Sequence, residues 1–482
     1  MNFAELFVFI LYLVAMIGIG LYFFLRSKGA NEKDYFLGGR QMGAWVSALS
    51  AGASDMSAWV LMGLPASIYA AGLGKAWIAI GLMIGYALSW IIEAPRLRRF
   101  SIEANDSITI PQYLTNRFLS KSRALQIVCA VIFIVAYTIY AASSIKACGT
   151  LFNTVLGMNA TVAMYLAAAI IIGYTFLGGF SAVCWTDFFQ GLLMLAALMI
   201  APIFAWSLIQ SGQVQANTTF PEHFWSFAAD WRDIVSGLGW GLGYFGMPHI
   251  IIRFMSIKSE KELRKSSVIG ISWTLIILVM SVLSACVGRM FLGEISDSST
   301  VFIQLTRHIF PPLVSGILLS AILAASMSTA DSQLLASASA FASDVYKPIF
   351  RKNASDREML WAGRVVVMAI ALIALIIASN PNSGTIMGLV ENAWGVFGAA
   401  FGPTIMLSLF WRRLTFGGAV AGIVTGALAD ILWLVYLKGT GVYEIIPGFI
   451  LGWVAAVVAS NLAPEPGADV QALFDRATAS ER

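Results

Sequence analysis

The chain has 482 residues, of which 59% are hydrophobic, 12% are charged and 43 are glycine, with a mean hydropathy of +0.79. Soluble domains of this size carry about twice that share of charge and do not bury so much apolar surface. The composition therefore excludes soluble enzymes, nucleic-acid binders and secreted disulfide scaffolds, and it indicates an integral membrane protein. The net charge is only +4, and the placement of the charges is more informative than their sum.

Nearly uncharged runs recur along the whole chain. A helix needs about 20 apolar residues to cross a hydrocarbon core of about 30 Å. Because the first run follows no basic segment and precedes no small-residue cleavage site, we expect a retained helix rather than a signal peptide. Thirteen runs are predicted to span the membrane as helices: 5–25, 43–71, 75–94, 124–151, 161–180, 187–210, 234–256, 266–292, 311–342, 360–379, 385–410, 415–437 and 443–463.

Lysine and arginine are distributed unevenly between the loops. With the N-terminus outside, 24 of the 30 basic residues fall on the cytoplasmic side, after runs one, three, seven, nine, eleven and thirteen. The positive-inside rule therefore predicts an external N-terminus and a cytoplasmic C-terminus. We expect one polytopic transmembrane domain over 1–463 and a cytoplasmic tail over 464–482, which is too short for a signalling or catalytic domain.

A polar stripe interrupts the second run. Ser47, Ser50, Ser54 and Ser57 are spaced by three and four residues and share one helical face, with Asp55 beside them near mid-membrane. Close helix packing would explain a lone serine pair. A carboxylate in the same stripe is costly in a bilayer, and it favours an ion or substrate site.

The seventh run contains five glycines between 237 and 246, followed by Pro248, a pattern that opposes a continuous helix. Residues 241–246 match the G-x-G-x-x-G pattern, but no strand precedes them, so a dinucleotide site is rejected. Interrupted helices at corresponding positions of two halves are typical of inverted-repeat transporters. We therefore expect an all-α protein with a 5+5 core over about 43–410, built from runs two to six and seven to eleven. The second and seventh runs of this core are broken, and the repeat is inferred from position because the halves show no convincing identity.

A third polar cluster lies in the ninth run, where Ala325, Ser328, Thr329 and Ser332 share a helical face. A sodium ion takes about five or six oxygen ligands, and hydroxyls with carbonyls freed by an unwound second run would supply them. A packing face of small residues is the alternative, and the cluster by itself does not decide between the two.

Four segments carry a resemblance to a known family: 47–65, 174–190, 240–255 and 316–335. With these segments in this order, the chain closely resembles the sodium:solute symporter family from the first run to about residue 462. The second and third segments are similar to its proline-transporting branch. Met247 stands where some members carry a polar residue, which leaves the fine substrate preference open.

The resemblance implies a leucine-transporter-type core of ten helices with three additional spans, in a bacterial inner membrane. It implies a sodium site formed by backbone oxygens of Ala53, Met56 and Ala325 and by the hydroxyls of Ser328 and Thr329. Asp55 would support this site, and Asp187 would lie on the ion path. It also implies a substrate pocket formed by Ser57, Trp59, Gly63, Tyr140, Trp240, Tyr244, Pro248 and Gly316.

The chemistry of these residues agrees with proline, a zwitterion with an apolar ring. Amide groups of the half-helix after Met56 can receive its carboxylate. Trp59, Trp240 and Tyr244 can enclose the ring. We therefore expect import of L-proline with a co-transported sodium ion by alternating access.

Other functions stay open from the sequence. A related symporter could carry another amino acid, pantothenate, a sugar or a carboxylate. Asp55 could couple transport to protons, and a transporter-like sensor would bind without transport. An embedded enzyme is the weakest alternative, because no nucleophile–histidine pair or metal set is discernible. Besides proline, sodium and the lipid bilayer, we expect no nucleic-acid partner and no obligatory protein partner.

Overall fold

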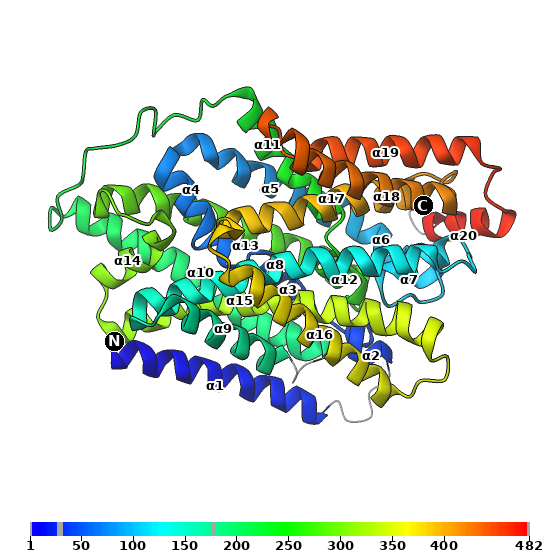
Figure 1. Cartoon of the computed structure of the whole chain (residues 1–482), viewed down its shortest axis with the longest axis horizontal. Coiled ribbons are helices and arrows are strands. Elements are labelled where there is room, and N and C mark those ends of the chain that lie inside the picture. Colours follow the sequence, from blue (N-terminus) through cyan, green and yellow to red (C-terminus); the bar gives the residue numbers. More distant parts are fainter. Residues whose placement is uncertain (1, 27–31, 176–178, 480–482) are drawn as a thin grey trace.

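The computed structural model describes residues 2–26, 32–175 and 179–479, and every regular element in these ranges is a helix. Lys28, Arg482 and residues 176–178 of the second motif lie outside the described residues. The long helices lie side by side and run along the long axis of the molecule (Figure 1). Ten of the described helices are long and apolar enough to cross a membrane. The chain is therefore an all-helical, multi-pass membrane protein, as its composition predicts.

Most predicted runs form uninterrupted helices. The third run is α5 (Trp77–Leu88), a π-helical turn (Ser89–Glu93) and α6 (Ala94–Glu103) in succession. Several helices extend past the apolar runs, because charged residues end a hydropathy signal without ending a helix. The other unbroken runs correspond to α1 (Phe3–Arg26), α8 (Ala124–Leu156), the shorter α9 (Ala160–Thr175), α10 (Phe180–Gln210), α13 (Glu260–Leu292), α15 (Pro312–Ser339) with its π-helical extension Ala340–Phe350, α16 (Asp356–Ser379), α17 (Ile386–Phe410), α18 (Phe416–Leu432) and α19 (Ile445–Leu462).

Two predicted runs are broken in the structure. The second run consists of α3 (Ala44–Asp55), a 3-10 turn (Ala58–Val60) and α4 (Gly63–Ala71). The seventh consists of α11 (Trp231–Gly239), a 3-10 turn (Trp240–Phe245) and α12 (Pro248–Ser256). Both interruptions coincide with the serine- and glycine-rich patterns, so the predicted breaks in these two runs are confirmed.

The broken helices lie inside the bundle. In α15 and α17, which pack around them, 83% and 89% of the most apolar stretch is buried, against 28% for each of α1, α18 and α19. The helices α1, α18 and α19 therefore present most of their surface outward. The polar interruptions face the interior.

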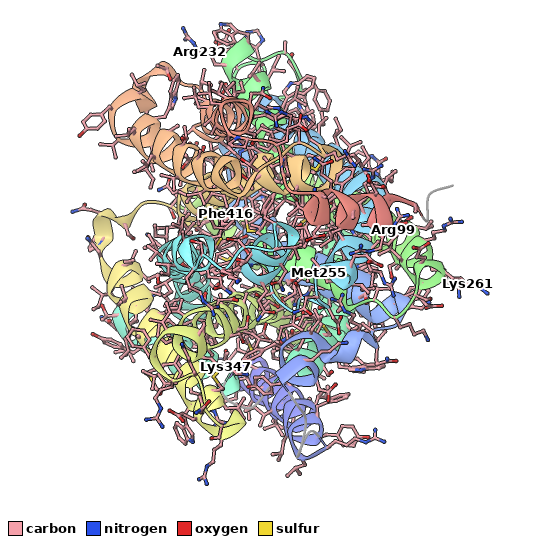
Figure 2. The ribbon with its side chains drawn as sticks, turned by 90° about the vertical axis from the view of Figure 1, so that its right-hand side faces the viewer. Arg99, Arg232, Met255, Lys261, Lys347 and Phe416 are labelled. Atoms are coloured by element: carbon pink, nitrogen blue, oxygen red, sulfur yellow. The ribbon has the colours of Figure 1, made fainter. Side chains whose placement is uncertain are left out.

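The predicted cytoplasmic clusters of basic residues gather at one end of the bundle. There Arg40 donates to Asp106 at 2.8 Å, and Arg98 donates to the carbonyl of Ile257 at 2.8 Å. These contacts join the loops that follow the first, third and seventh runs. Figure 2 looks at this end, and among its labelled residues are three from the basic clusters, each on a different element: Arg99, Lys261 and Lys347.

Short helices cover the same end. They are α2 (Glu32–Leu37), α7 (Ile110–Arg117) and the C-terminal α20 (Ala468–Ala479), while α14 (Val301–Ile309) lies at the opposite end (Figure 1). Asp475 of α20 accepts two hydrogen bonds from Arg412, at 2.9 and 2.7 Å. These bonds lower the pKa of the Asp475 carboxyl. Arg476 donates to Glu103 at 3.2 Å, so the tail is a helix docked on the bundle, which its composition did not indicate.

Candidate functional site

The first helix break releases a backbone carbonyl in the bundle interior. α3 ends at Asp55, and Met56 leaves the helical conformation with φ −77° and ψ 69°. The amide of Ser57 donates to the carbonyl of Asp55 at 2.8 Å instead of continuing the helical ladder to Ala53. Because a buried carbonyl must find another partner, the Ala53 oxygen is open to a side chain or a cation.

α15 brings hydroxyl groups to this carbonyl. Ser328 Oγ donates to the Ala53 oxygen at 2.8 Å and lies 3.2 Å from the carbonyl oxygen of Ala325. Thr329 Oγ1 is buried and has no hydrogen-bond partner within the described residues. Four of the five predicted sodium ligands thus lie on two facing elements, and Met56 is the residue at which α3 breaks. Uncharged oxygens of this kind suit a hard cation.

Asp55 connects the two helix breaks. Its Oδ2 accepts a hydrogen bond from the hydroxyl of Tyr244 at 2.6 Å. Both residues are fully buried, and Asp55 Oδ1 has no partner within the described part of the chain. Its buried charge lowers the electrostatic cost of a cation in this part of the bundle.

The glycines of the second break allow close backbone approach. A Cβ at Gly241 would lie 2.4 Å from the carbonyl oxygen of Gly81, and a Cβ at Gly243 would lie 2.0 Å from Trp394 Nε1. α5 and α17 therefore pack directly on the broken segment. Pro248 occupies the first turn of α12, where its missing N–H costs no helical bond.

Aromatic rings enclose the second break. The ring of Tyr244 lies edge-on to Tyr86 and Trp394, with centroids 5.1 and 5.0 Å away. Trp394 Nε1 donates to the backbone carbonyl of Trp240 at 2.8 Å. Edge-on packing is a favoured geometry for aromatic rings. These contacts therefore fix the orientation of the rings around the second break, which together form the aromatic wall of the candidate pocket.

The other predicted substrate residues surround the first break. Trp59 Nε1 donates to the carbonyl of Asp55 at 3.2 Å, and the Trp59 amide donates to Ser57 Oγ at 3.4 Å. A Cβ at Gly63 would lie 3.3 Å from Trp59 Cβ, so the glycine preserves space beside the indole. The Tyr140 hydroxyl is buried without a partner among the described residues, which leaves its hydrogen-bonding capacity for a ligand.

Gly316 is placed differently. It lies near the start of α15, nine residues before Ala325, or about 13 Å along the helix at 1.5 Å per residue. A Cβ there would meet Glu5 Cα at 3.0 Å and Val8 Cβ at 3.1 Å, both on α1. The structure accounts for this glycine by helix packing, and it does not bring Gly316 to the breaks.

Asp187 of α10 belongs to a separate buried network. Its Oδ2 accepts hydrogen bonds from Ser50 Oγ at 2.7 Å and from the Arg253 guanidinium at 3.2 Å. The same guanidinium donates to Ser50 Oγ at 3.1 Å and to Ser332 Oγ. The Asp187 and Arg253 side chains are 0% and 2% exposed. This network joins α3, α10, α12 and α15 through one ion pair.

Sequence reasoning missed four residues of these groups. Arg253 is a basic residue near the end of the seventh run, and an arginine paired with an intramembrane acid is the signal that could have found it. His249 is fully buried and its Nε2 donates to the Ser54 carbonyl at 3.2 Å. Tyr86 and Trp394 offered no signal, because aromatic residues are common along membrane helices.

A cavity adjoins the candidate pocket at the end of the bundle away from the basic clusters. It has a volume of about 500 Å³, and Trp240 and Met387 line it. Met387 also contacts the first break, since a Cβ at Gly63 would lie 3.4 Å from Met387 Cβ. The cavity therefore ends against the same aromatic and helix-break residues that form the candidate site.

Comparison with known proteins identifies the family. The model of the sodium:solute symporter family matches residues 35–426. The chain belongs to the sodium:solute symporter family. Among similar proteins of this family are the osmoregulated proline transporter of Bacillus subtilis, 43% identical over 96% of this chain and 96% of that one, and the sodium/proline symporter of Escherichia coli, 42% identical over 98% and 95%.

A solved structure has the same fold. The outward-open, substrate-bound form of a Na⁺-coupled sialic acid symporter superposes with a TM-score of 0.78 at 20% sequence identity, over 97% of this chain and 99% of that one. The family consists of transporters, so the chain is not an enzyme. Ten long apolar helices agree with a multi-pass membrane transporter.

The buried ion pair yields a stability prediction. Arg253→Met leaves the Asp187 carboxylate buried without its counter-ion, which should cost about 3–5 kcal/mol and lower the unfolding temperature of the purified protein in detergent. Adding Asp187→Asn to the same chain should recover most of the loss. Arg412→Gln, which removes an exposed partner of Asp475, is the control and should change the unfolding temperature little. Equal unfolding temperatures for Arg253→Met and the unaltered protein would contradict the assigned pairing.

Proposed function

We propose that this protein imports L-proline together with sodium by alternating access. The observation that carries the proposal is the hydrogen bond from Ser328 to the Ala53 carbonyl at the first helix break, with the buried Thr329 hydroxyl next in the same helix and without a partner among the described residues. The proline transporters of Bacillus subtilis and Escherichia coli that resemble this chain over nearly its full length support the same conclusion.

In this proposal sodium binds between α3 and α15. In the structure the Ser328 hydroxyl bonds to the Ala53 carbonyl. A sodium ion between the two oxygens replaces that hydrogen bond with two ion–oxygen contacts and ties the broken segment to α15. The assigned ligands are the oxygens of Ala53, Met56, Ala325, Ser328 and Thr329, with the Asp55 charge lowering the cost of the ion and Asp187 on its exit path.

Proline binds beside the ion. Its carboxylate faces the amides that follow Met56, and its ring lies against the aromatic wall. Because the ion orders the segment that forms this pocket, each ligand tightens the other by the same factor. The assigned pocket residues are Ser57, Trp59, Gly63, Tyr140, Trp240, Tyr244 and Pro248.

The arrangement in the membrane follows from the same reasoning. The domain over 1–463 has thirteen spans: ten long helices, the short α9 and the two interrupted pairs α3–α4 and α11–α12. Residues 464–482 form a cytoplasmic tail. Runs two to six and seven to eleven form the inverted repeats. The end that carries the basic clusters faces the cytoplasm, so the N-terminus lies outside a bacterial inner membrane.

The ion gradient supplies enough free energy for accumulation. One positive charge moving through 100 mV releases about 2.3 kcal/mol, and a tenfold sodium gradient adds about 1.4 kcal/mol. With one sodium per proline, the sum of about 3.7 kcal/mol sustains a concentration ratio of several hundred.

The orientation is testable with introduced cysteines. The four native cysteines are buried, whereas Arg232 and Lys261 are exposed. Arg232 lies at the start of α11 and Lys261 follows the end of α12, so the interrupted span α11–α12 separates them. A membrane-impermeant maleimide should label Arg232→Cys on intact cells and Lys261→Cys only after permeabilisation. The chain without introduced cysteines is the control, and the reverse labelling pattern would refute the orientation.

Sodium coupling is tested in proteoliposomes with labelled proline. The unaltered protein should accumulate proline only under an inward sodium gradient. Ser328→Ala and Thr329→Ala should each raise the half-saturating sodium concentration at least tenfold, since each removes an assigned ligand. Ser320→Ala is the control on the same helix, because its hydroxyl donates to the Gly316 carbonyl within α15 at 2.8 Å. Accumulation driven by a proton gradient alone would instead indicate proton coupling through Asp55.

Tyr244→Phe tests the link between the two breaks. It removes the hydroxyl that donates to Asp55, and hydrogen bonds to charged groups contribute about 1.5–3 kcal/mol. The half-saturating proline concentration should rise about tenfold in uptake assays. Tyr113→Phe removes a buried hydroxyl that bonds to Ser408 away from the site and should leave it unchanged. Equal behaviour of the two variants would argue against a role for the Tyr244 hydroxyl.

A further inference from the structure

His249 is a buried histidine that the proposed transport cycle leaves without a role. It is the second residue of α12, directly after Pro248 and the second helix break, and its side chain is fully buried. Its imidazole bonds to α3 on one side and to α8 on the other. Ionisable residues inside membrane segments are rare and commonly mark functional positions, so the contacts of this ring indicate what it does.

The hydrogen bonds of the ring define which nitrogen carries hydrogen. Nε2 lies 3.2 Å from the carbonyl oxygen of Ser54, and because a carbonyl only accepts, Nε2 is the donor. Nδ1 lies 3.2 Å from the hydroxyl of Tyr137, which also accepts from the His249 backbone amide at 3.0 Å. In a neutral ring with hydrogen on Nε2, Tyr137 donates to Nδ1, and each of these groups has a partner.

Tyr137 is held in place by elements other than the broken helices. Its ring packs against Phe397 of α17 with centroids 4.4 Å apart, and against Phe133 of α8 at 5.8 Å. The position of the hydroxyl is therefore set by α8 and α17. Because this hydroxyl orients the imidazole, the Nε2–H group is aimed at the Ser54 carbonyl.

The Ser54 carbonyl is the neighbour of a carbonyl assigned to sodium. Ser54 is the residue before the end of α3, and its oxygen accepts from His249, whereas the Ala53 oxygen accepts from Ser328. Peptide groups are planar and rigid, so only the φ and ψ angles of Ser54 lie between these two carbonyls. A side chain that holds one carbonyl therefore restricts the direction of the other.

We propose that His249 is a positioning residue for sodium, which holds the Ser54 carbonyl so that the Ala53 carbonyl points at the ion. The inference rests on the proposed function, because it takes Ala53 as a sodium ligand. His249 belongs to α12 and Ser54 to α3. A shift between the two interrupted helices therefore separates the imidazole from the carbonyl and loosens the sodium site, so the affinity for sodium depends on the position of α12.

The test measures equilibrium binding of labelled proline to the purified full chain at increasing sodium concentrations. A glutamine amide reaches about as far as Nε2, whereas an asparagine amide reaches only as far as Nδ1. His249→Asn should therefore raise the half-saturating sodium concentration about tenfold, as expected for the loss of one buried hydrogen bond. His249→Gln restores the donor and should bring the value to within about threefold of that of the unaltered protein.

Tyr137→Phe tests the same contact without altering the imidazole. It lets the ring carry hydrogen on Nδ1 instead of Nε2, so the half-saturating sodium concentration should rise about threefold. Tyr113→Phe, which removes a buried hydroxyl bonded to Ser408, is the matched control and should leave it unchanged. At saturating sodium the half-saturating proline concentration should be the same in all variants, because His249 acts on the ion site.

The outcomes separate this inference from the proposed function. If the unaltered protein shows no sodium-dependent proline binding, the proposed function is overturned and the role of His249 falls with it. If the unaltered protein binds proline but His249→Asn and His249→Gln share one half-saturating sodium concentration, the positioning role alone is overturned. A purely structural histidine gives that result, with lower unfolding temperatures for both variants.

Two further results also overturn the positioning role. A higher half-saturating proline concentration at saturating sodium would place His249 in the substrate pocket. Where both changes at buried His249 prevent folding, Tyr137→Phe decides, and a half-saturating sodium concentration equal to that of Tyr113→Phe would refute the role.

Discussion

The hydrogen bond from Tyr244 to Asp55 links the two interruptions around which the bundle is arranged. A broken helix inside a membrane protein frees polar backbone groups, and these must be satisfied by protein because no water reaches the hydrocarbon core. Ser328 supplies that partner for Ala53, and His249 for Ser54. Each break is therefore tolerated because the other break, together with α15, approaches it closely. The glycines at the second break permit this approach by leaving room for α5 and α17.

The same constraint acts on the charged groups. Asp187 and Arg253 are both removed from water, so each is stable only while the other remains in contact. Ser50 and Ser332 add hydrogen bonds from two further helices. A motion that separates α10 from α12 must therefore provide a new partner for each charge. In the proposed alternating-access cycle, such a pair favours two packed arrangements over a continuum.

The parts of the site that could be predicted from the sequence are those that interrupt the apolar runs of the membrane-spanning helices. Serines and an aspartate marked the first break, glycines and a proline marked the second, and the Ser328–Thr329 pair marked the facing helix. Residues that fit the pattern carried no such signal. Trp394 and Tyr86 resemble any aromatic residue of a span, and their roles arise only from contacts across helices. Gly316 was predicted to line the pocket, and in the structure it packs against α1. A glycine beside a ligand and a glycine beside another helix look alike in one sequence. The docked helix α20 depends on ion pairs with distant loops, which local composition does not reveal.

The charge of Asp55 determines which step of the proposed cycle responds to the membrane potential. Proline as a zwitterion adds no net charge, and the Asp187–Arg253 network is taken to keep the same charge throughout the cycle. With Asp55 ionised, sodium makes the loaded centre neutral, and the empty centre carries one negative charge. The potential then acts on the return of the empty carrier. With Asp55 protonated, the loaded centre is positive and the potential acts on the inward step. The total free energy per cycle is the same in both cases, because one sodium crosses in each.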